Sequence, residues 1–269
     1  MTTDATSLRD RFRALHAEGC FAIPNPFDVG SALLLQHLGA AALATTSSGF
    51  AATLGRPDQH VRRDELVEHV AALCAAVAVP INVDAEGCYP SDDGGIARTV
   101  ELLAGAGAAG VSIEDYDPEF GGILPLADAA ERVGVAAEAC RASGVVLTGR
   151  AEQLLYGSGD LDEVIDRLCA YRDAGADVVY APGLVRLEDI RRVVDEVGVA
   201  VNVLALPGVP PLAELAAAGV RRVSTGGSLS WVAYGAFAAA AAELLGPGTT
   251  AYLDSMLPRS TRQAAFTAG

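Results

Sequence analysis

The chain contains no lysine, because all 19 of its basic residues are arginine. Enzymes that form a Schiff base with their substrate and enzymes that bind pyridoxal phosphate both need a lysine amine, so the sequence excludes both classes. It also excludes a Walker-type phosphate-binding loop, in which a lysine contacts the phosphates. Any anion that the protein recognises must therefore be bound by arginine or by backbone N–H groups.

Basic residues are also scarce as a class. The 19 arginines stand against 34 aspartates and glutamates, which gives a formal net charge of −15 at pH 7. Nucleic-acid binding depends on a basic surface. We therefore expect no nucleic-acid partner.

Two further features are missing, namely paired cysteines and long apolar segments. The five cysteines are scattered without a Cys-x-x-Cys pair, as is typical of reduced thiols in the cytoplasm. The N-terminus has no apolar signal core, and the alanine-rich stretch Phe237–Leu245 is too short to span a bilayer. We therefore expect a soluble, cytoplasmic protein with no membrane partner.

The chain instead alternates between short apolar runs and helical patterns. The apolar runs predict strands at Cys20–Pro24, Ala42–Thr46, Ile81–Ala85, Gly110–Ile113, Val145–Gly149, Asp177–Tyr180, Val201–Leu204 and Arg222–Ser224. The helical patterns cover Asp28–Gly39, Asp64–Val77, Asp92–Gly107, Leu126–Gly144, Asp160–Gly175, Leu187–Gly198, Leu212–Gly219 and Ser228–Leu245. An amphipathic helix at about residues 7–19 precedes these units, and a tail at about residues 246–269 follows them.

Eight strand–helix units within about 250 residues are typical of a TIM barrel. We therefore predict an α/β fold, a (β/α)8 barrel in which residues 1–269 form one domain. The alternative is a doubly wound open sheet, which usually has fewer strands and a glycine-rich turn after the first strand. Here that turn is Asn25-Pro26-Phe27-Asp28, which carries no phosphate-binding fingerprint, so the barrel is preferred.

Carboxylates end two neighbouring strands of the predicted barrel. Asp84 and Glu86 follow the third apolar run, and Glu114 follows the fourth. Because TIM barrels hold their catalytic groups at the C-terminal ends of the strands, we expect the three carboxylates to meet there, where they would repel one another without a cation. Oxygen ligands without His or Cys favour Mg²⁺ or Mn²⁺ over zinc. Each acid taken alone could equally be a helix cap or a surface residue.

Two further groups at the same face are suited to an anionic substrate. The segment Thr46-Ser47-Ser48-Gly49 offers hydroxyl and N–H donors to an oxyanion, although it could also be a plain polar loop. Arg150 ends the fifth strand close to Glu152, so it could form a salt bridge at the barrel mouth or bind a substrate carboxylate. The four histidines are expected to face solvent: His16, His37, His60 and His69.

Several segments together carry a resemblance to a known family. They are Pro24–Asp28 with Ser31-Ala32, Thr45–Gly49 with Leu54–Asp58, Asp84–Glu86 with Tyr89, Ile113–Asp115, Gly149–Glu152 and Ala174–Asp177. On these segments the chain resembles the isocitrate lyase / phosphoenolpyruvate mutase superfamily over nearly its whole length. The resemblance implies a (β/α)8 barrel, usually tetrameric, whose last helix is exchanged between subunits. It also implies a 2-oxo or 2-hydroxy acid as the substrate.

The resemblance assigns roles to residues of the predicted site. It implies Mg²⁺ bound by Asp84, while Glu86, Glu114 and Asp58 hold the water molecules of the metal. It implies that the substrate carboxylate is bound by Thr46, Ser47, Ser48, Gly49 and Arg150.

The chain departs from this family where the proton donor is expected. Lyases of the family carry a Lys-Cys-Gly type loop after the fourth-strand acid, whereas this chain has Tyr116–Ile123, without Cys, Lys or His. Tyr89, Tyr116, Asp58 or a metal-bound water are then the candidates for proton transfer. The polar residues that bind the far end of a tricarboxylate are also replaced, by Pro182, Leu204, Leu206 and Trp231. These replacements argue against isocitrate or methylisocitrate and for a small or apolar far end of the substrate.

These observations favour a Mg²⁺- or Mn²⁺-dependent carbon–carbon lyase, retro-aldol or decarboxylating, acting on a small 2-oxo or 2-hydroxy acid through a metal-stabilised enolate. We place Arg150, Asp58, Tyr89 and Glu114 among its catalytic residues and expect a dimer or tetramer of identical chains. One alternative is a hydrolase or mutase of a phosphonopyruvate-like compound, with Arg150 and Arg56 supplying positive charge. Another is a non-catalytic barrel that binds a small acid.

Overall fold

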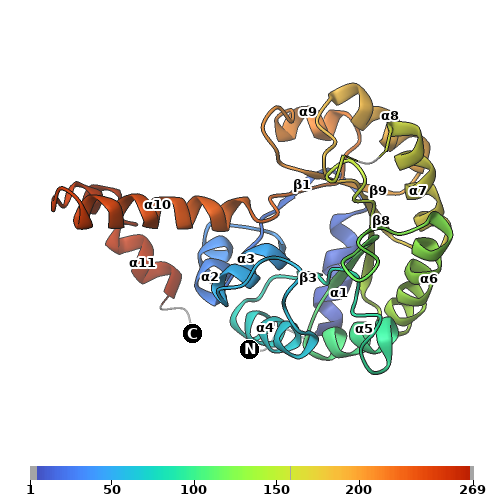
Figure 1. Cartoon of the computed structure of the whole chain (residues 1–269), viewed down its shortest axis with the longest axis horizontal. Coiled ribbons are helices and arrows are strands. Elements are labelled where there is room, and N and C mark those ends of the chain that lie inside the picture. The colour runs from blue at the N-terminus through green and yellow to red at the C-terminus, as the bar shows by residue number, and fades with distance from the viewer. Residues whose placement is uncertain (1–4, 158, 267–269) are drawn as a thin grey trace.

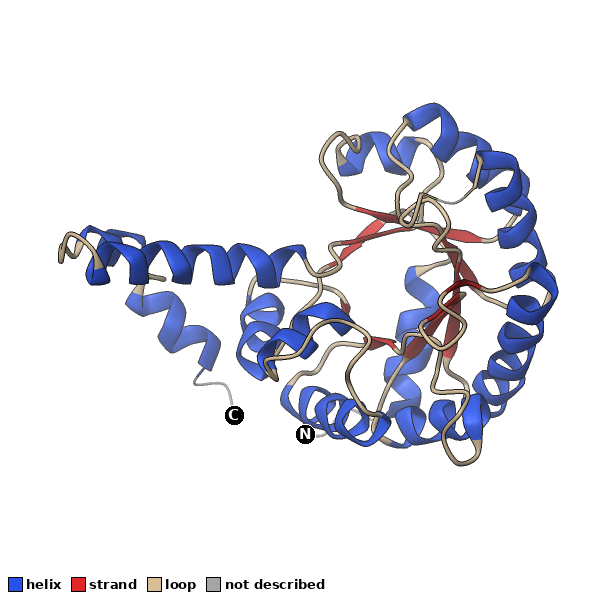
Figure 2. Cartoon of the chain, in the orientation of Figure 1, coloured by secondary structure: helices blue, strands red, loops and turns tan. Residues whose placement is uncertain are grey.

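Eight parallel strands form the centre of the molecule, and helices surround them (Figure 2). The structure is a computed structural model, which describes residues 5–157 and 159–266. The strands follow the order β1-β10-β9-β8-β7-β4-β3-β2 and make a nearly closed barrel, which confirms the predicted (β/α)8 fold. Their bounds are β1 (Phe21–Ile23), β2 (Leu43–Ala44), β3 (Ile81–Asp84), β4 (Gly110–Glu114), β7 (Val146–Arg150), β8 (Val178–Tyr180), β9 (Ala200–Leu204) and β10 (Arg222–Ser224).

Nine helices in the described part of the chain surround the barrel, and all but α1 and α3 begin and end close to the predicted bounds. They are α1 (Ala5–Leu15), α2 (Val29–His37), α3 (Ser47–Thr53), α4 (Arg63–Ala76), α5 (Gly95–Gly105), α6 (Leu126–Ser143), α7 (Leu161–Asp173), α8 (Leu187–Val197) and α9 (Leu212–Ala217). Asp28 caps α2, because its Oδ1 accepts the N–H of Ser31 at 2.7 Å. Gly144 (φ +71°) and Gly198 (φ +68°) end α6 and α8 in the left-handed conformation that glycine adopts without strain.

The strand register brings the predicted site residues to one edge of the barrel. In the pairing of β4 with β7, Glu114 lies opposite Arg150. In the pairing of β3 with β4, Asp84 lies opposite Ser112. The C-terminal ends of β3, β4 and β7 therefore stand side by side.

Alternate residues of the strands face two different environments. Val83, Val111 and Leu147 are fully buried in the main apolar cluster, together with helix residues such as Val100 and Leu168. The strand residues that alternate with these outward-facing ones line the barrel interior. One cavity there is bounded by residues of all eight strands. The apolar core thus lies between the strands and the helices and supports the strand ends from outside.

Three segments form structure that the sequence analysis did not predict. The segment that begins at Thr46 is the start of helix α3 and not a plain polar loop. Tyr116–Ile123 contains an antiparallel hairpin of β5 (Tyr116–Asp117) and β6 (Gly122–Ile123). The tail contains a 3₁₀ helix, η1 (Ala251–Ser255), and the helix α11 (Arg259–Phe266), which packs against α2. The last three positions of the tail, 267–269, lie outside the described residues, and α1 ends at Leu15, earlier than predicted.

Helix α10 (Ser228–Leu245) projects away from the barrel, and α11 folds back beside it (Figure 1). Its large side chains are exposed, among them Val232 (69%), Phe237 (73%) and Leu245 (85%). By length and composition alone, it is the one helix in the described part of the chain that is able to cross a membrane, and it is longer than the alanine-rich run within it. An exposed apolar surface of this kind marks an interaction surface.

Candidate active site

Arg150, at the end of β7, forms ion pairs with three carboxylates. Its Nη1 lies 2.5 Å from Oδ1 of Asp84, its Nη2 lies 3.0 Å from Oε2 of Glu114, and its Nε lies 2.9 Å from Oε1 of Glu152. The Arg150 and Asp84 side chains are 13% and 15% exposed, and those of Glu114 and Glu152 are almost fully buried. The structure therefore brings Asp84 and Glu114 together, as the sequence predicts, and places a guanidinium between them.

The neighbours of Arg150 keep its guanidinium protonated. Burial alone lowers the pKa of Arg150, but the charges of Asp84, Glu152 and Glu114 raise it well above its ordinary value. The Tyr180 ring at the end of β8 adds a cation–π contact, with the guanidinium carbon 5.3 Å from its centroid. Sequence analysis missed Tyr180, although its position at a strand end marks it as a residue of the barrel mouth.

Two more predicted acids, Glu86 and Asp58, lie against the same group. Glu86 is 7% exposed, and its Oε1 has no hydrogen-bond partner among the described residues. Burial, followed by the charges of Asp84 and Asp58, raises the pKa of Glu86 to about 8. Burial and the charge of Asp84 likewise raise the pKa of Asp58. These mutual effects show that Asp58, Asp84 and Glu86 share one small region.

Gln59 is a site residue that sequence reasoning missed. Its Nε2 donates to Oε1 of Glu114 at 2.7 Å. Its backbone has φ +63°, a left-handed conformation that is uncommon outside glycine, and Glu86 (φ +50°) shares this feature. Strained backbone of this kind gathers at functional sites, because the surrounding structure has to hold it in place. Only the adjacent Asp58 gave a signal in the sequence.

The donor set fits a hard divalent cation in its chemistry. The acids offer only oxygen atoms, as Mg²⁺ and Mn²⁺ prefer, and the unpartnered Oε1 of Glu86 is a buried acceptor available to a cation. In the arrangement seen here, Asp84 and Glu114 face Arg150. Within residues 5–157 and 159–266, no group of three or more His, Cys, Asp or Glu side chains already has the spacing of a metal site. A metal would therefore have to replace Arg150 as the partner of these oxygens.

The segment Thr46–Gly49 has its own partners within the protein. Thr46 caps α3, and its Oγ1 accepts the N–H of Gly49 at 3.3 Å. The N–H of Ser47 donates to Oδ2 of Asp84 at 3.1 Å, and Ser48 Oγ lies 3.3 Å from Thr46 Oγ1. The segment thus lies against the carboxylates as predicted, while its role towards a substrate stays a prediction.

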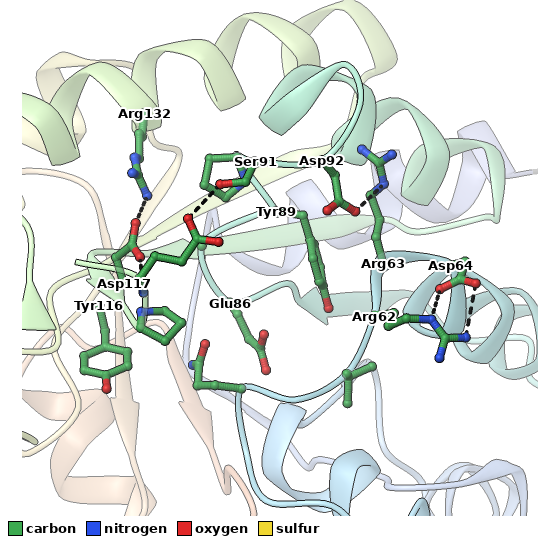
Figure 3. Close-up of a pocket in the computed structure, with 16 residues that line it drawn as sticks. Arg62, Arg63, Asp64, Glu86, Tyr89, Ser91, Asp92, Tyr116, Asp117 and Arg132 are labelled. Carbon is green, nitrogen blue, oxygen red and sulfur yellow. Dashed lines mark hydrogen bonds and ion pairs between the residues drawn. The ribbon is translucent and has the colours of Figure 1, made fainter. Parts of the chain in front are cut away.

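The predicted proton-transfer residues Tyr89 and Tyr116 line a cavity of about 620 Å³ beside Glu86 (Figure 3). Burial, reinforced by the charge of Glu86, raises the pKa of Tyr89 well above its ordinary value, so its hydroxyl keeps its proton. Tyr116, at the start of the β5–β6 hairpin, stacks on Tyr156 with ring centroids 4.3 Å apart. Each arginine on the wall of this cavity is paired with an aspartate: Arg62 with Asp64, Arg63 with Asp92, and Arg132 with Asp117.

A buried network behind the site supports Glu152. Oδ1 of Asp115 accepts the backbone N–H of Glu152 at 2.8 Å, and Oδ2 accepts the hydroxyl of Tyr171 at 2.6 Å. Arg167 Nη1 lies 3.2 Å from the same Oδ2. Asp115 is thus held by two groups of α7 and in turn fixes the residue that binds Nε of Arg150.

Two of the histidines do not face solvent as expected. His69, on α4, is 9% exposed and stacks on Phe50 with ring centroids 3.8 Å apart. His16 packs edge-on against Phe12 and Phe21. Burial lowers the pKa of His69 to about 4 and that of His16 to about 3, so both rings are neutral at pH 7.

Residues 12–245 match the family described as phosphoenolpyruvate phosphomutase. The chain belongs to this family. An uncharacterised protein of Mycobacterium tuberculosis (strain ATCC 25618 / H37Rv) is 34% identical over 260 residues, which cover 96% of this chain and 95% of that protein. The 2-methylisocitrate lyase of Salmonella typhimurium is 29% identical over 209 residues, which cover 73% of this chain and 70% of the lyase.

Solved structures agree with this assignment. The crystal structure of a candidate lyase/mutase from Burkholderia cenocepacia J2315 superposes with a TM-score of 0.93 at 43% sequence identity, covering 98% of this chain and 97% of that one. The isocitrate lyase / phosphoenolpyruvate mutase resemblance is thereby confirmed, and the protein is an enzyme of this lyase and mutase superfamily.

Proposed function

We propose that the protein is a Mg²⁺- or Mn²⁺-dependent carbon–carbon lyase that acts on a small 2-oxo or 2-hydroxy carboxylic acid. The observation that carries this proposal is the ion-paired group at the barrel mouth, in which Arg150 is shared by Asp84, Glu114 and Glu152. A group of acids around a fixed arginine supplies both a cation-binding donor set and a partner for a carboxylate. Membership of a family with a named carbon–carbon lyase agrees with it.

The acids and the arginine take separate roles in this proposal. Asp84 would hold the cation directly, and Glu86, Glu114 and Asp58 would hold its water molecules. A divalent cation there supplies a Lewis acid that stabilises the enolate charge produced by cleavage of the carbon–carbon bond. Arg150 binds the substrate carboxylate, with hydroxyl and N–H donors from Thr46–Gly49 beside it, and Glu152 fixes the plane of the guanidinium.

Proton transfer is assigned to groups that are fixed in the structure. Tyr89 lines the cavity beside Glu86, and its hydroxyl, whose pKa burial raises, is protonated at neutral pH and can donate to an enolate carbon as a weak acid. Asp58, whose pKa is also raised, is the second candidate. Tyr116 is engaged in stacking with Tyr156 and is the weakest of the three.

The far end of the substrate is proposed to be small or apolar. Leu204 ends β9, Leu206 follows it, and Trp231 lies in the first turn of α10. These side chains give no charged partner to a second or third carboxylate, whose burial without one is costly. Methylisocitrate, named for the Salmonella relative, is therefore a poor candidate for this chain.

The test is turnover of candidate acids by the purified protein with Mg²⁺ or Mn²⁺. Oxaloacetate, alkyl-substituted malates and phosphonopyruvate are supplied separately, and release of pyruvate or glyoxylate is followed. We expect the wild-type protein to cleave oxaloacetate or a malate, and we expect Asp84→Asn to abolish this cleavage. Asp162→Asn is the matched control, because that side chain is 72% exposed on α7 and pairs with Arg192, not with a residue of the site. Cleavage that persists in Asp84→Asn would overturn the proposed role of the metal site.

The phosphonopyruvate alternative is disfavoured by the position of Arg56. Its Nη1 and Nη2 donate to Oε2 and Oε1 of Glu65 at 2.7 and 3.0 Å, so its charge is already paired. Turnover of phosphonopyruvate alone would reverse this ranking. A failure to turn over any of the acids would instead favour the binding-only alternative for these substrates.

We also propose that the chain works as a homo-oligomer in the cytoplasm. The exposed apolar side chains of α10 support an exchanged or shared helix. All five cysteines are free, which agrees with a reducing compartment. Cell fractionation tests the location, and the oligomer is tested below.

A further inference from the structure

The interior of the barrel, below the group around Arg150, is polar. A cavity of about 50 Å³ is lined by residues of every strand, from Ile23 on β1 and Ala44 on β2 round to β10. Most of its lining is polar: Asn25, Thr45, Asn82, Asp84, Ser112, Arg150, Tyr180, Asn202, Arg222 and Ser224. TIM-barrel interiors are ordinarily filled by branched apolar side chains, so this lining calls for an explanation.

Arg222 is the buried cation in this lining. It is 2% exposed, at the start of β10. Its Nε donates to Oδ1 of Asn202 at 2.9 Å, and its Nη2 donates to Oγ1 of Thr148 at 3.1 Å. Its Nη1 lies 3.4 Å from Nε2 of His16, a ring that burial keeps neutral. All three partners are uncharged.

No carboxylate offsets this charge in the described part of the chain. The ion pairs there include none to Arg222, and Asp84, the acid that lines the cavity, is bound by Arg150. Burial, opposed by Tyr180 and reinforced by the positive charge of Arg150, lowers the pKa of Arg222 to about 10. A buried charge without a counter-charge is strongly unfavourable, so the protein gains stability from any anion that can reach it.

The cavity is large enough and polar enough to hold such an anion. One water molecule needs roughly 10–15 Å³ of space measured in this way, so the cavity of about 50 Å³ also admits a halide ion. Arg222 uses three of the five N–H groups of its guanidinium on Asn202, Thr148 and His16.

We propose that the barrel interior holds a small monovalent anion of chloride size, bound by Arg222. The anion would neutralise the guanidinium and occupy the polar cavity under the active site. Water alone would satisfy hydrogen bonds there but would leave the positive charge unpaired. A larger anion such as gluconate cannot enter a cavity of this volume.

Crystals of the protein grown or soaked in sodium bromide test the site directly. We expect an anomalous scattering peak inside the barrel at hydrogen-bonding distance from Arg222. Water density without an anomalous peak at this position, or a peak at Arg150 alone, would overturn the proposal. The wild-type chain is used, so the test does not depend on a variant that folds, and it does not depend on catalytic activity.

Thermal stability gives a second measurement. Replacing gluconate by chloride at constant ionic strength should raise the Tm of the wild-type protein by a few °C, with saturation. Arg222→Met should lose the saturable rise. Arg221→Met is the matched control, because the adjacent arginine donates to the carbonyl of Gly19 at the protein surface and should keep the rise. An equal chloride effect in both variants would contradict the proposal.

Discussion

The backbone N–H of Glu152 donates to Oδ1 of Asp115 over 2.8 Å, and this bond joins the barrel mouth to an ion pair inside the barrel wall. Asp115 is 2% exposed, and Arg167 and Tyr171 of α7 hold its other oxygen. The position of Glu152, and through it that of Arg150, therefore depends on residues that do not reach the mouth.

Removal of the Asp115 carboxylate should be strongly destabilising. Asp115→Ala leaves the guanidinium of Arg167 buried without its partner, which should cost about 3–5 kcal/mol in the free energy of unfolding. Tyr171→Phe removes one hydrogen bond and should cost about 1–2 kcal/mol. Urea unfolding followed by circular dichroism measures both. Asp64→Ala, at an exposed ion pair, should change the value far less. A similar cost for Asp64→Ala and Asp115→Ala would contradict the role of the buried network.

The buried ring of His69 should make stability fall in acid. Its pKa is about 4 in the folded protein and 6.5 in the unfolded chain, so below pH 6.5 the unfolded chain binds a proton that the folded chain does not. The stabilisation is complete above pH 6.5 and is lost as the pH falls towards 4. The full difference corresponds to about 3 kcal/mol.

The comparison of wild type with His69→Phe isolates this effect. Phenylalanine keeps the stacking on Phe50 but cannot bind a proton. Between pH 7 and pH 4.5 the wild-type protein should lose about 2–3 kcal/mol more of its unfolding free energy than the variant does. Equal losses in urea titrations at the two pH values would show that His69 is protonated in the folded state or is not buried.

Binding of a divalent cation should depend on Asp84. Asp84→Asn should weaken the binding of Mn²⁺ by at least about 10-fold, measured by isothermal titration calorimetry without substrate. Asp162→Asn should bind Mn²⁺ as the wild type does, since its side chain lies in an exposed pair with Arg192. Unchanged affinity in Asp84→Asn would place the cation elsewhere.

The cation and an anionic ligand should also help each other to bind. Arg150 is engaged by three carboxylates, so it is not free to bind a substrate carboxylate until a cation takes over Asp84 and Glu114. Oxalate should therefore raise the affinity for Mn²⁺ by about 10-fold, and Mn²⁺ should raise the affinity for oxalate by the same factor. Arg150→Met should abolish this coupling. Independent binding of the two ligands to the wild-type protein would be evidence against a shared arginine.

The exposed face of α10 should set the oligomeric state. Phe237→Glu places a charge at a side chain that is 73% exposed in the single chain and that a partner chain is expected to bury. We expect the variant to elute as a smaller species than the wild type, with light scattering giving the masses. Glu138→Gln on α6 is the control for a surface change elsewhere. A wild-type protein that is monomeric at all concentrations would contradict the proposed oligomer.

The fold was predictable because it rests on local, repeated signals. Each apolar run is long enough for one strand, and Asp28, Gly144 and Gly198 mark helix ends by capping chemistry that the sequence displays. The proximity of Asp84 to Glu114 followed from the same logic, since neighbouring parallel strands end at one edge.

The interaction partners of the site residues were harder to predict from the sequence than the fold. Arg150 was expected either to pair with Glu152 or to bind substrate, and a three-way ion pair depends on side-chain directions that strand order does not fix. Gln59 donates to Glu114 from a backbone in a left-handed conformation, for which a glutamine gives no signal. His69 lies on the buried face of α4, together with Leu66, Val70 and Leu73, and the mixed apolar and polar pattern of this helix did not reveal that face.

The way in which the barrel closes between β1 and β2 affects how easily its wall opens locally. The strand order ends at β1 and β2, and the two are joined by the N–H of Ala44 donating to the carbonyl of Pro24 at 3.2 Å and by Nδ2 of Asn25 donating to the carbonyl of Thr45 at 2.7 Å. Oδ1 of Asn25 also accepts the N–H groups of Thr225 and Gly226, so one amide side chain spans the ends of three strands. The ring is thus closed here by one backbone hydrogen bond and the side chain of Asn25, whereas backbone ladders join the other neighbouring strands. Backbone amide protons between β1 and β2 should therefore exchange with deuterium sooner than those between β4 and β7.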